Sequence, residues 1–130
     1  MGVIVKPYCT CGYTTKEIYL GGGMGNFYRN CLLPFYCIHC KEIYGRNILK
    51  KHKGEYIVDT KIHCRICSSE LVIYGILTSF DNDEIQTKEI DDCIEWNPNH
   101  YTSYYLNRNH HHCPNCGKEE IEFEELGIWD

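Results

Sequence analysis

Eight cysteines of this 130-residue chain stand in four close pairs. The pairs are Cys9/Cys11, Cys37/Cys40, Cys64/Cys67 and Cys113/Cys116. Two residues separate the cysteines of the last three pairs, and one residue separates those of the first. A short spacing of this kind places two sulfurs on one side of a tight turn, and two such turns together supply the four thiolates of a tetrahedral metal site. The sequence therefore predicts two metal sites that use all eight cysteines.

Disulfide bonds are the competing use of the cysteines, of which the chain has ten. A disulfide framework joins cysteines that are distant in sequence, whereas a bridge inside C-x-x-C closes only a very small loop. The first residues lack a charged segment followed by a long apolar run, and no stretch reaches the about 18 apolar residues of a membrane span. We therefore expect a cytoplasmic protein without membrane association. Thiols stay reduced in that compartment, which favours two Zn²⁺ ions per chain over disulfides.

Strand-like segments surround the cysteine pairs. Residues 14–20, 70–77 and 119–126 are rich in β-branched, aromatic or alternating apolar residues, and no amphipathic helix longer than two turns is indicated. The pattern runs twice along the chain. It predicts a mainly β, zinc-stabilised fold of two tandem units, residues 1–62 with a basic hairpin and residues 63–130 with an acidic insertion at 81–95.

The succession of cysteine pair, strand, loop, strand and cysteine pair resembles the zinc ribbons. The letters C-P-N-C-G at 113–117 are similar to the C-P-x-C-G knuckle of that family, in which the glycine permits the turn that directs backbone amides at the sulfurs. We use "knuckle" for a cysteine pair and the turn between its members. The knuckle at 9–12 keeps the glycine, and the two central knuckles keep only the cysteine spacing. The resemblance implies a fold and a metal, but no particular function.

Two pairings of the four knuckles are open. Sequential pairing joins the first knuckle to the second across 25 residues, and the third to the fourth across 45. Nested pairing joins the two central knuckles across 23 residues and brings the ends of the chain together. Loop-closure entropy rises only slowly with loop length, so both are feasible. The internal repeat favours sequential pairing, which is our prediction.

A four-cysteine site leaves no coordination position for water, which catalytic zinc normally keeps. The chain also lacks H-E-x-x-H and the deaminase signature. We therefore predict a non-enzymatic protein. Iron suits the same spacing, so a rubredoxin-like electron carrier is an alternative. Histidines beside the knuckles (His39, His63 and residues 110–112) are alternative ligands, although eight cysteines already complete two sites. Cys31 and Cys93 belong to no pair and are expected to be free thiols in the protein interior.

Charge is distributed unequally along the chain. The net charge is −5, yet residues 1–62 carry nine Lys or Arg against four Asp or Glu, and residues 63–130 carry four against fourteen. Two four-cysteine zinc sites would bring the total to about −9. Binding of nucleic acid over the whole surface is therefore not expected. A local nucleic-acid site would use cations near Tyr44 and Tyr56. These are Arg46, Lys50, Lys51, Lys53 and Lys61.

An aromatic segment is the second candidate surface. Trp96, Tyr101, Tyr104 and Tyr105 stand among polar residues, and Trp and Tyr in such surroundings are enriched at protein interfaces. Packing of these rings over the protein's own core is the competing interpretation. The sequence thus predicts a zinc-binding module that acts as an adaptor, with a protein partner slightly favoured over nucleic acid.

Overall fold

The computed structural model describes residues 2–23, 29–79, 93–99 and 102–129. In these ranges the chain forms strands, turns and loops, and it contains no helix that could cross a membrane. In chain order the strands are β1 (Gly2–Tyr8), β2 (Ile18–Leu20), β3 (Leu32–Cys37), β4 (Glu42–Asn47), β5 (Leu49–His52), β6 (Glu55–Val58), β7 (Val72–Ile73), β8 (Ile76–Ser79), β9 (Cys93–Asn99), β10 (Thr102–Asn107) and β11 (Glu122–Trp129). The prediction of a mainly β protein is confirmed.

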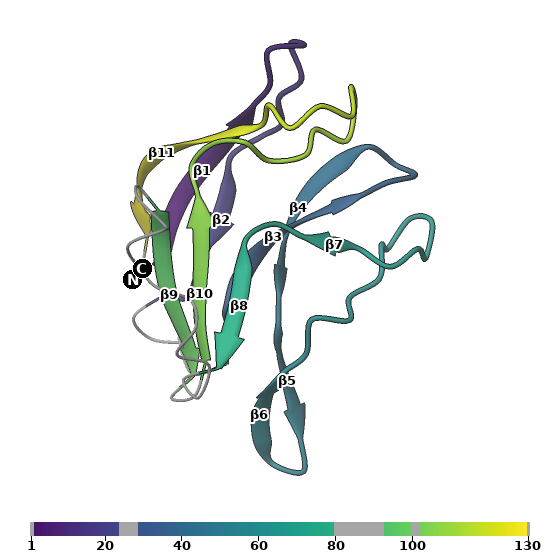
Figure 1. Ribbon diagram of the computed structural model, residues 1–130. Helices are drawn as coiled ribbons and strands as arrows, with labels where there is room; N and C mark the ends of the chain where they lie inside the picture. The colour runs from purple at the N-terminus through teal and green to yellow at the C-terminus, as the bar shows by residue number, and fades with distance from the viewer. Residues whose placement is uncertain (1, 24–28, 80–92, 100–101, 130) are drawn as a thin grey trace.

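The described strands form three sheets of three strands and one hairpin. The sheets have the orders β11-β1-β2, β8-β10-β9 and β4-β3-β7, and β5 pairs with β6. Each neighbouring pair of strands is antiparallel. Figure 1 shows the β5–β6 hairpin extending away from the rest of the molecule. Its two-residue turn, Lys53-Gly54, has positive φ at both positions, as the tightest hairpin turns require.

The first and last described strands lie side by side. β1 pairs with β11 from Gly2 opposite Trp129 to Tyr8 opposite Glu122, with a bulge between Ile4 and Val5. The two ends of the chain therefore lie together (Figure 1). A second sheet also joins distant segments, because β7 pairs with β3 through Phe35 and Tyr36. Strand pairing thus crosses residue 62, where the sequence suggested a boundary between two units.

One hydrophobic core serves the described part of the chain. The buried side chains form a single cluster with members on both sides of residue 62. The largest fully buried ones include Phe35 and Leu33 from β3, Tyr104 from β10 and Phe123 from β11. Tyr104 and Leu106 alternate with the more exposed Tyr105 and Asn107, as the two-residue period of a strand dictates. The acidic insertion lies mostly outside the described residues, since 80–92 are not described.

Candidate metal centres

The inner cluster combines the second and third knuckles. Cys37 ends β3 and Cys40 lies in the turn before β4, whereas Cys64 and Cys67 come from the turn between β6 and β7. The Sγ atoms of Cys37 and Cys67 are 3.4 Å apart, and those of Cys40 and Cys64 are 3.8 Å apart. The pairing of β3 with β7 brings the two knuckles together.

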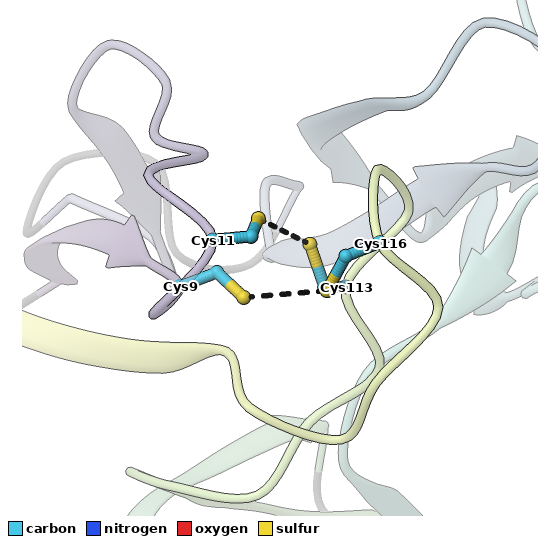
Figure 2. A group of neighbouring side chains, drawn as sticks. All are labelled: Cys9, Cys11, Cys113 and Cys116. Carbon is cyan, nitrogen blue, oxygen red and sulfur yellow. Dashed lines mark hydrogen bonds between the residues drawn. The ribbon is translucent and has the colours of Figure 1, made fainter.

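The outer cluster combines the first and fourth knuckles. Cys9 and Cys11 follow β1, and Cys113 and Cys116 precede β11, so the pairing of β1 with β11 aligns them. Figure 2 shows side chains from these two separate turns directed toward one another. The Sγ atoms of Cys9 and Cys116 are 3.6 Å apart, and those of Cys11 and Cys113 are 3.8 Å apart. The hydroxyl of Thr10 donates to the carboxylate of Glu120 and links the same two turns.

Both clusters have the dimensions of a four-sulfur metal site. All ligand atoms in each cluster lie within 4.8 Å of one another. In a tetrahedron with metal–sulfur bonds of about 2.3 Å, the sulfurs would be about 3.8 Å apart, close to the separations of 3.4–3.8 Å in the two clusters. All ten cysteines are free, so no disulfide competes for these sulfurs. The donor sets therefore fit a tetrahedral, thiophilic metal ion.

The four knuckles close their turns with the same kind of backbone hydrogen bond, which spans three residues in the first knuckle and four in the others. In each, the N–H of the residue after the second cysteine donates to the carbonyl of the first cysteine over 2.9–3.0 Å. That residue has a left-handed φ in every case. The values are 95° at Gly12, 55° at Lys41, 63° at Ser68 and 78° at Gly117. A lysine or serine in this conformation costs roughly 1 kcal/mol, so the turn is maintained at the central knuckles even without glycine.

Hydrogen-bond donors near the sulfurs favour the thiolate form at three positions, one of them Cys64, whose pKa is lowered by the backbone N–H groups of Cys67 and Ile66. The backbone N–H of Tyr13 and the side-chain amide of Asn115 lower the pKa of Cys11 to about 6. Hydrogen bonds from the side chain and backbone of Ser69 lower the pKa of Cys67 to about 6. Burial instead raises the pKa of Cys113 to about 12. Metal ligation requires thiolates, and these donors supply part of the stabilisation that negative sulfur needs.

The structure corrects the predicted pairing of the knuckles. Sequential pairing would have joined the first knuckle to the second, but the clusters join the first to the fourth and the second to the third. The nested alternative is therefore right. The repeat along the sequence is a repeat of turns and strands, and it does not determine which turns meet.

Side chains between the clusters connect them. The hydroxyl of Tyr13, beside the outer cluster, donates to the carbonyl of Lys41 in an inner knuckle over 3.0 Å. The ring of Tyr74 packs against Tyr36 of β3 and Phe123 of β11, with centroids 4.8 and 5.3 Å away. The histidines that were alternative ligands belong to neither group of sulfurs. Two of them, His111 and His112, instead pack against Tyr74 and Tyr36 respectively.

Tyr104 does not lie on a surface that a partner could reach. Its side chain has an exposed fraction of 0%, its hydroxyl donates to the carbonyl of Tyr74, and its ring stacks on Trp96 at 5.8 Å. Trp96 and Tyr105 are half-buried, and Tyr101 lies outside the described residues. For Tyr104, the competing interpretation of packing in the protein's own core is therefore the one that the structure supports.

Because Tyr104 is buried, a substitution at this position would measure a loss of folding stability. We expect Tyr104→Ala to lower the free energy of unfolding by about 3–5 kcal/mol, as removal of a buried ring does, before any effect on binding. Chemical denaturation of the metal-loaded protein measures this loss. Tyr105→Ala, in the next and half-buried position, is the matched control and should cost much less. Equal losses for the two variants would contradict the inward orientation of Tyr104.

The predicted basic residues are divided between two places. Lys51 and Lys53 are exposed on the β5–β6 hairpin, and Lys50 on the same hairpin forms an ion pair with Asp59 at 3.1 Å. Lys61 is exposed beyond that hairpin. Arg46 lies on β4, where it donates to the carbonyl of His63 over 3.1 Å. The structure therefore does not gather the five cations around one site.

A groove that the sequence did not reveal contains Arg46. It measures about 1060 Å³ and lies between the β1–β2 segment on one side and β4 with the third knuckle on the other. Its cations are Lys6, Lys16, Arg46 and Arg65. Burial and the charge of Arg65 lower the pKa of Arg46. These cations come from four separate segments, and no local pattern in the sequence indicates that they meet.

The remaining cysteines lie apart from both clusters. Cys31 is buried, and burial raises the pKa of its thiol to about 12, which suits an unreactive side chain. Cys93 is half-buried in β9. Neither belongs to the groups of sulfurs that could hold a metal.

The fold and the clusters together define a small, mainly β protein with two four-cysteine sites that could hold metal ions. Their knuckles are compatible with those of zinc ribbons. No family model, no curated protein and no solved structure matches the chain.

Proposed function

We propose that the protein is a non-enzymatic binding module that holds two Zn²⁺ ions and recruits another protein. The observation that carries this proposal is the grouping of eight cysteine sulfurs into two closed sets of four. Thiolate ligands in a tetrahedral arrangement are typical of structural zinc. Iron uses the same ligands in electron carriers, and metal analysis distinguishes the two.

Closed coordination supports a structural role for both ions. With four sulfurs on each metal, no position is left for the water molecule that a hydrolytic zinc ion activates. The knuckles fix strands from opposite ends of the chain, as β1 and β11 show. The metals would therefore stabilise a surface, and the function of the module would reside in what that surface binds.

A protein partner fits the described surface better than nucleic acid does. The chain has a net charge of −5, and its lysine-bearing hairpin includes an ion pair and the acidic residue Glu55. Large apolar side chains are exposed as well, among them Ile66 at 77% and Ile128 at 63%. Apolar side chains rimmed by charge are typical of protein interfaces.

Affinity capture tests this function. Holo-protein immobilised through a terminal tag is incubated with lysate of its native cell, with and without nuclease. We expect a protein partner that survives nuclease and is lost when a chelator unfolds the immobilised protein. Neutralising the hairpin with Lys50→Gln, Lys51→Gln and Lys53→Gln should leave capture unchanged. Recovery of RNA or DNA, abolished by the triple substitution and by salt, would contradict a protein-binding role.

A further inference from the structure

The groove between β2 and β4 is lined by Gly45, which has no side chain, and by charged residues on both sides. A Cβ atom added at Gly45 of β4 would lie 2.9 Å from Cγ2 of Ile18 and 3.1 Å from the carbonyl oxygen of Tyr19. β2 and β4 therefore pack closely at this point, where any larger residue would push them apart. The segment 14–17 forms one wall, and Arg65 and Ile66 of the third knuckle belong to the other.

The four cations of this groove have no acidic partner among the residues that the structure describes. Lys50, Arg108 and His112 form the ion pairs found in that part of the chain. Within the groove, Arg46 donates only to a backbone carbonyl, and Lys6 lies 5.7 Å from the centre of the Tyr8 ring. Four cations against the two carboxylates of Glu17 and Glu42 leave the groove with a net positive charge, in a protein whose total net charge is −5, and so create a local positive potential.

Apolar groups stand beside these cations. Tyr19 on β2 is 46% exposed, and Ile66 at the tip of the third knuckle is 77% exposed. Both line the groove. An aromatic ring and an aliphatic side chain offer contacts to an apolar side chain of a ligand, while the cations hold its carboxylates.

We propose that this groove binds an extended, acidic segment of a partner protein that carries at least one apolar side chain. The proposal rests on the protein-binding function proposed above and assigns its site. Glu17 and Glu42 also line the groove, so its formal charge is +2. A peptide with a few carboxylates matches that charge, whereas a nucleic acid carries a phosphate at every nucleotide and would meet the two glutamates and the acidic remainder of the protein.

The test uses a displayed library of random dodecapeptides, selected on the immobilised holo-protein. We expect enriched peptides that combine several Asp or Glu with an apolar residue. The affinity of a synthetic copy should fall at least about tenfold for the double variant Lys16→Glu/Arg65→Glu, because two attractive charges of the groove are replaced by repulsive ones. The matched control is Lys51→Glu/Lys61→Glu, which makes the same change in total charge outside the groove and should alter affinity by less than about twofold.

Metal content must be measured for each variant, since Arg65 lies inside a knuckle. If the Lys16→Glu/Arg65→Glu variant loses metal, Lys6→Glu/Lys16→Glu replaces it, and the same fall in affinity is expected. Failure to enrich acidic peptides, equal losses for groove and control variants, or displacement of the peptide by oligo(dT) would overturn the proposal. If the groove variants still capture the partner from lysate, the groove assignment fails and the proposed function stands.

Discussion

Removal of metal from the reduced protein is expected to unfold most of its β structure. The outer cluster fastens β1 to β11, the inner cluster fastens β3 to β7, and one core lies between them. Structural zinc contributes on the order of 10–16 kcal/mol in small peptides, which equals or exceeds the about 5–15 kcal/mol by which whole domains are stable. Circular dichroism and amide NMR dispersion, recorded during titration with a chelator, measure the loss.

The number of metal ions per chain is measured alongside the chelator titration. Elemental analysis of the native protein should find two zinc ions per chain, and zinc added back under reducing conditions should restore the folded spectrum. Dispersed amide resonances in the metal-free protein would contradict the expected dependence on metal, as would one ion or none per chain. Iron with visible charge-transfer absorption would instead favour the electron-carrier alternative.

The ligands and the strand content could be predicted because they depend on local features. A knuckle is a turn of a few residues, and its cysteine spacing is enough to indicate that two sulfurs face one point. A hydrogen bond from the residue after the second cysteine closes the turn in all four knuckles, across three residues in the first and across four in the others. Glycine at 12 and 117 indicated the left-handed residue, whereas Lys41 and Ser68 adopt it without a recognisable signal.

The nested arrangement could not be predicted from the same features. Closing the outer site across the 101 residues between Cys11 and Cys113, rather than across the 25 between Cys11 and Cys37, costs only about 1 kcal/mol more in chain entropy. The choice is therefore made by tertiary contacts such as the register of β1 with β11 and the packing of Tyr74 between Tyr36 and Phe123. None of these contacts is visible in the spacing of the cysteines.

The aromatic segment shows a second limit of prediction from the sequence. Its polar composition suggested an exposed surface, but alternation along β10 directs Tyr104 and Leu106 inward. The buried hydroxyl of Tyr104 is satisfied by the carbonyl of Tyr74, which is why a polar ring is tolerated in the core. The groove could not be predicted from the sequence either, because its cations are spread over 60 residues of sequence and come together only through strand packing.

Replacing one outer cysteine should remove one metal ion and leave the other in place. In the variant Cys9→Ser, the outer cluster retains three sulfurs and should lose its ion. The inner ion should remain bound, because its ligands lie in β3, in the turn before β4 and in the turn before β7, and include no residue of the outer knuckles. Cys116→Ser should give the same result, and Cys93→Ser should keep both ions, since Cys93 belongs to neither cluster.

Cadmium-113 NMR makes the pairing directly visible. In the cadmium-substituted protein, one metal resonance should correlate with the β-protons of Cys9, Cys11, Cys113 and Cys116, and the other with those of Cys37, Cys40, Cys64 and Cys67. Cys9→Ser should remove the first resonance alone. Loss of the ion bound by Cys37 and Cys40 would instead show sequential pairing and contradict the nested clusters. Because the outer ion joins β1 to β11, its loss should also abolish the amide protection of those two strands while β3 and β4 stay protected.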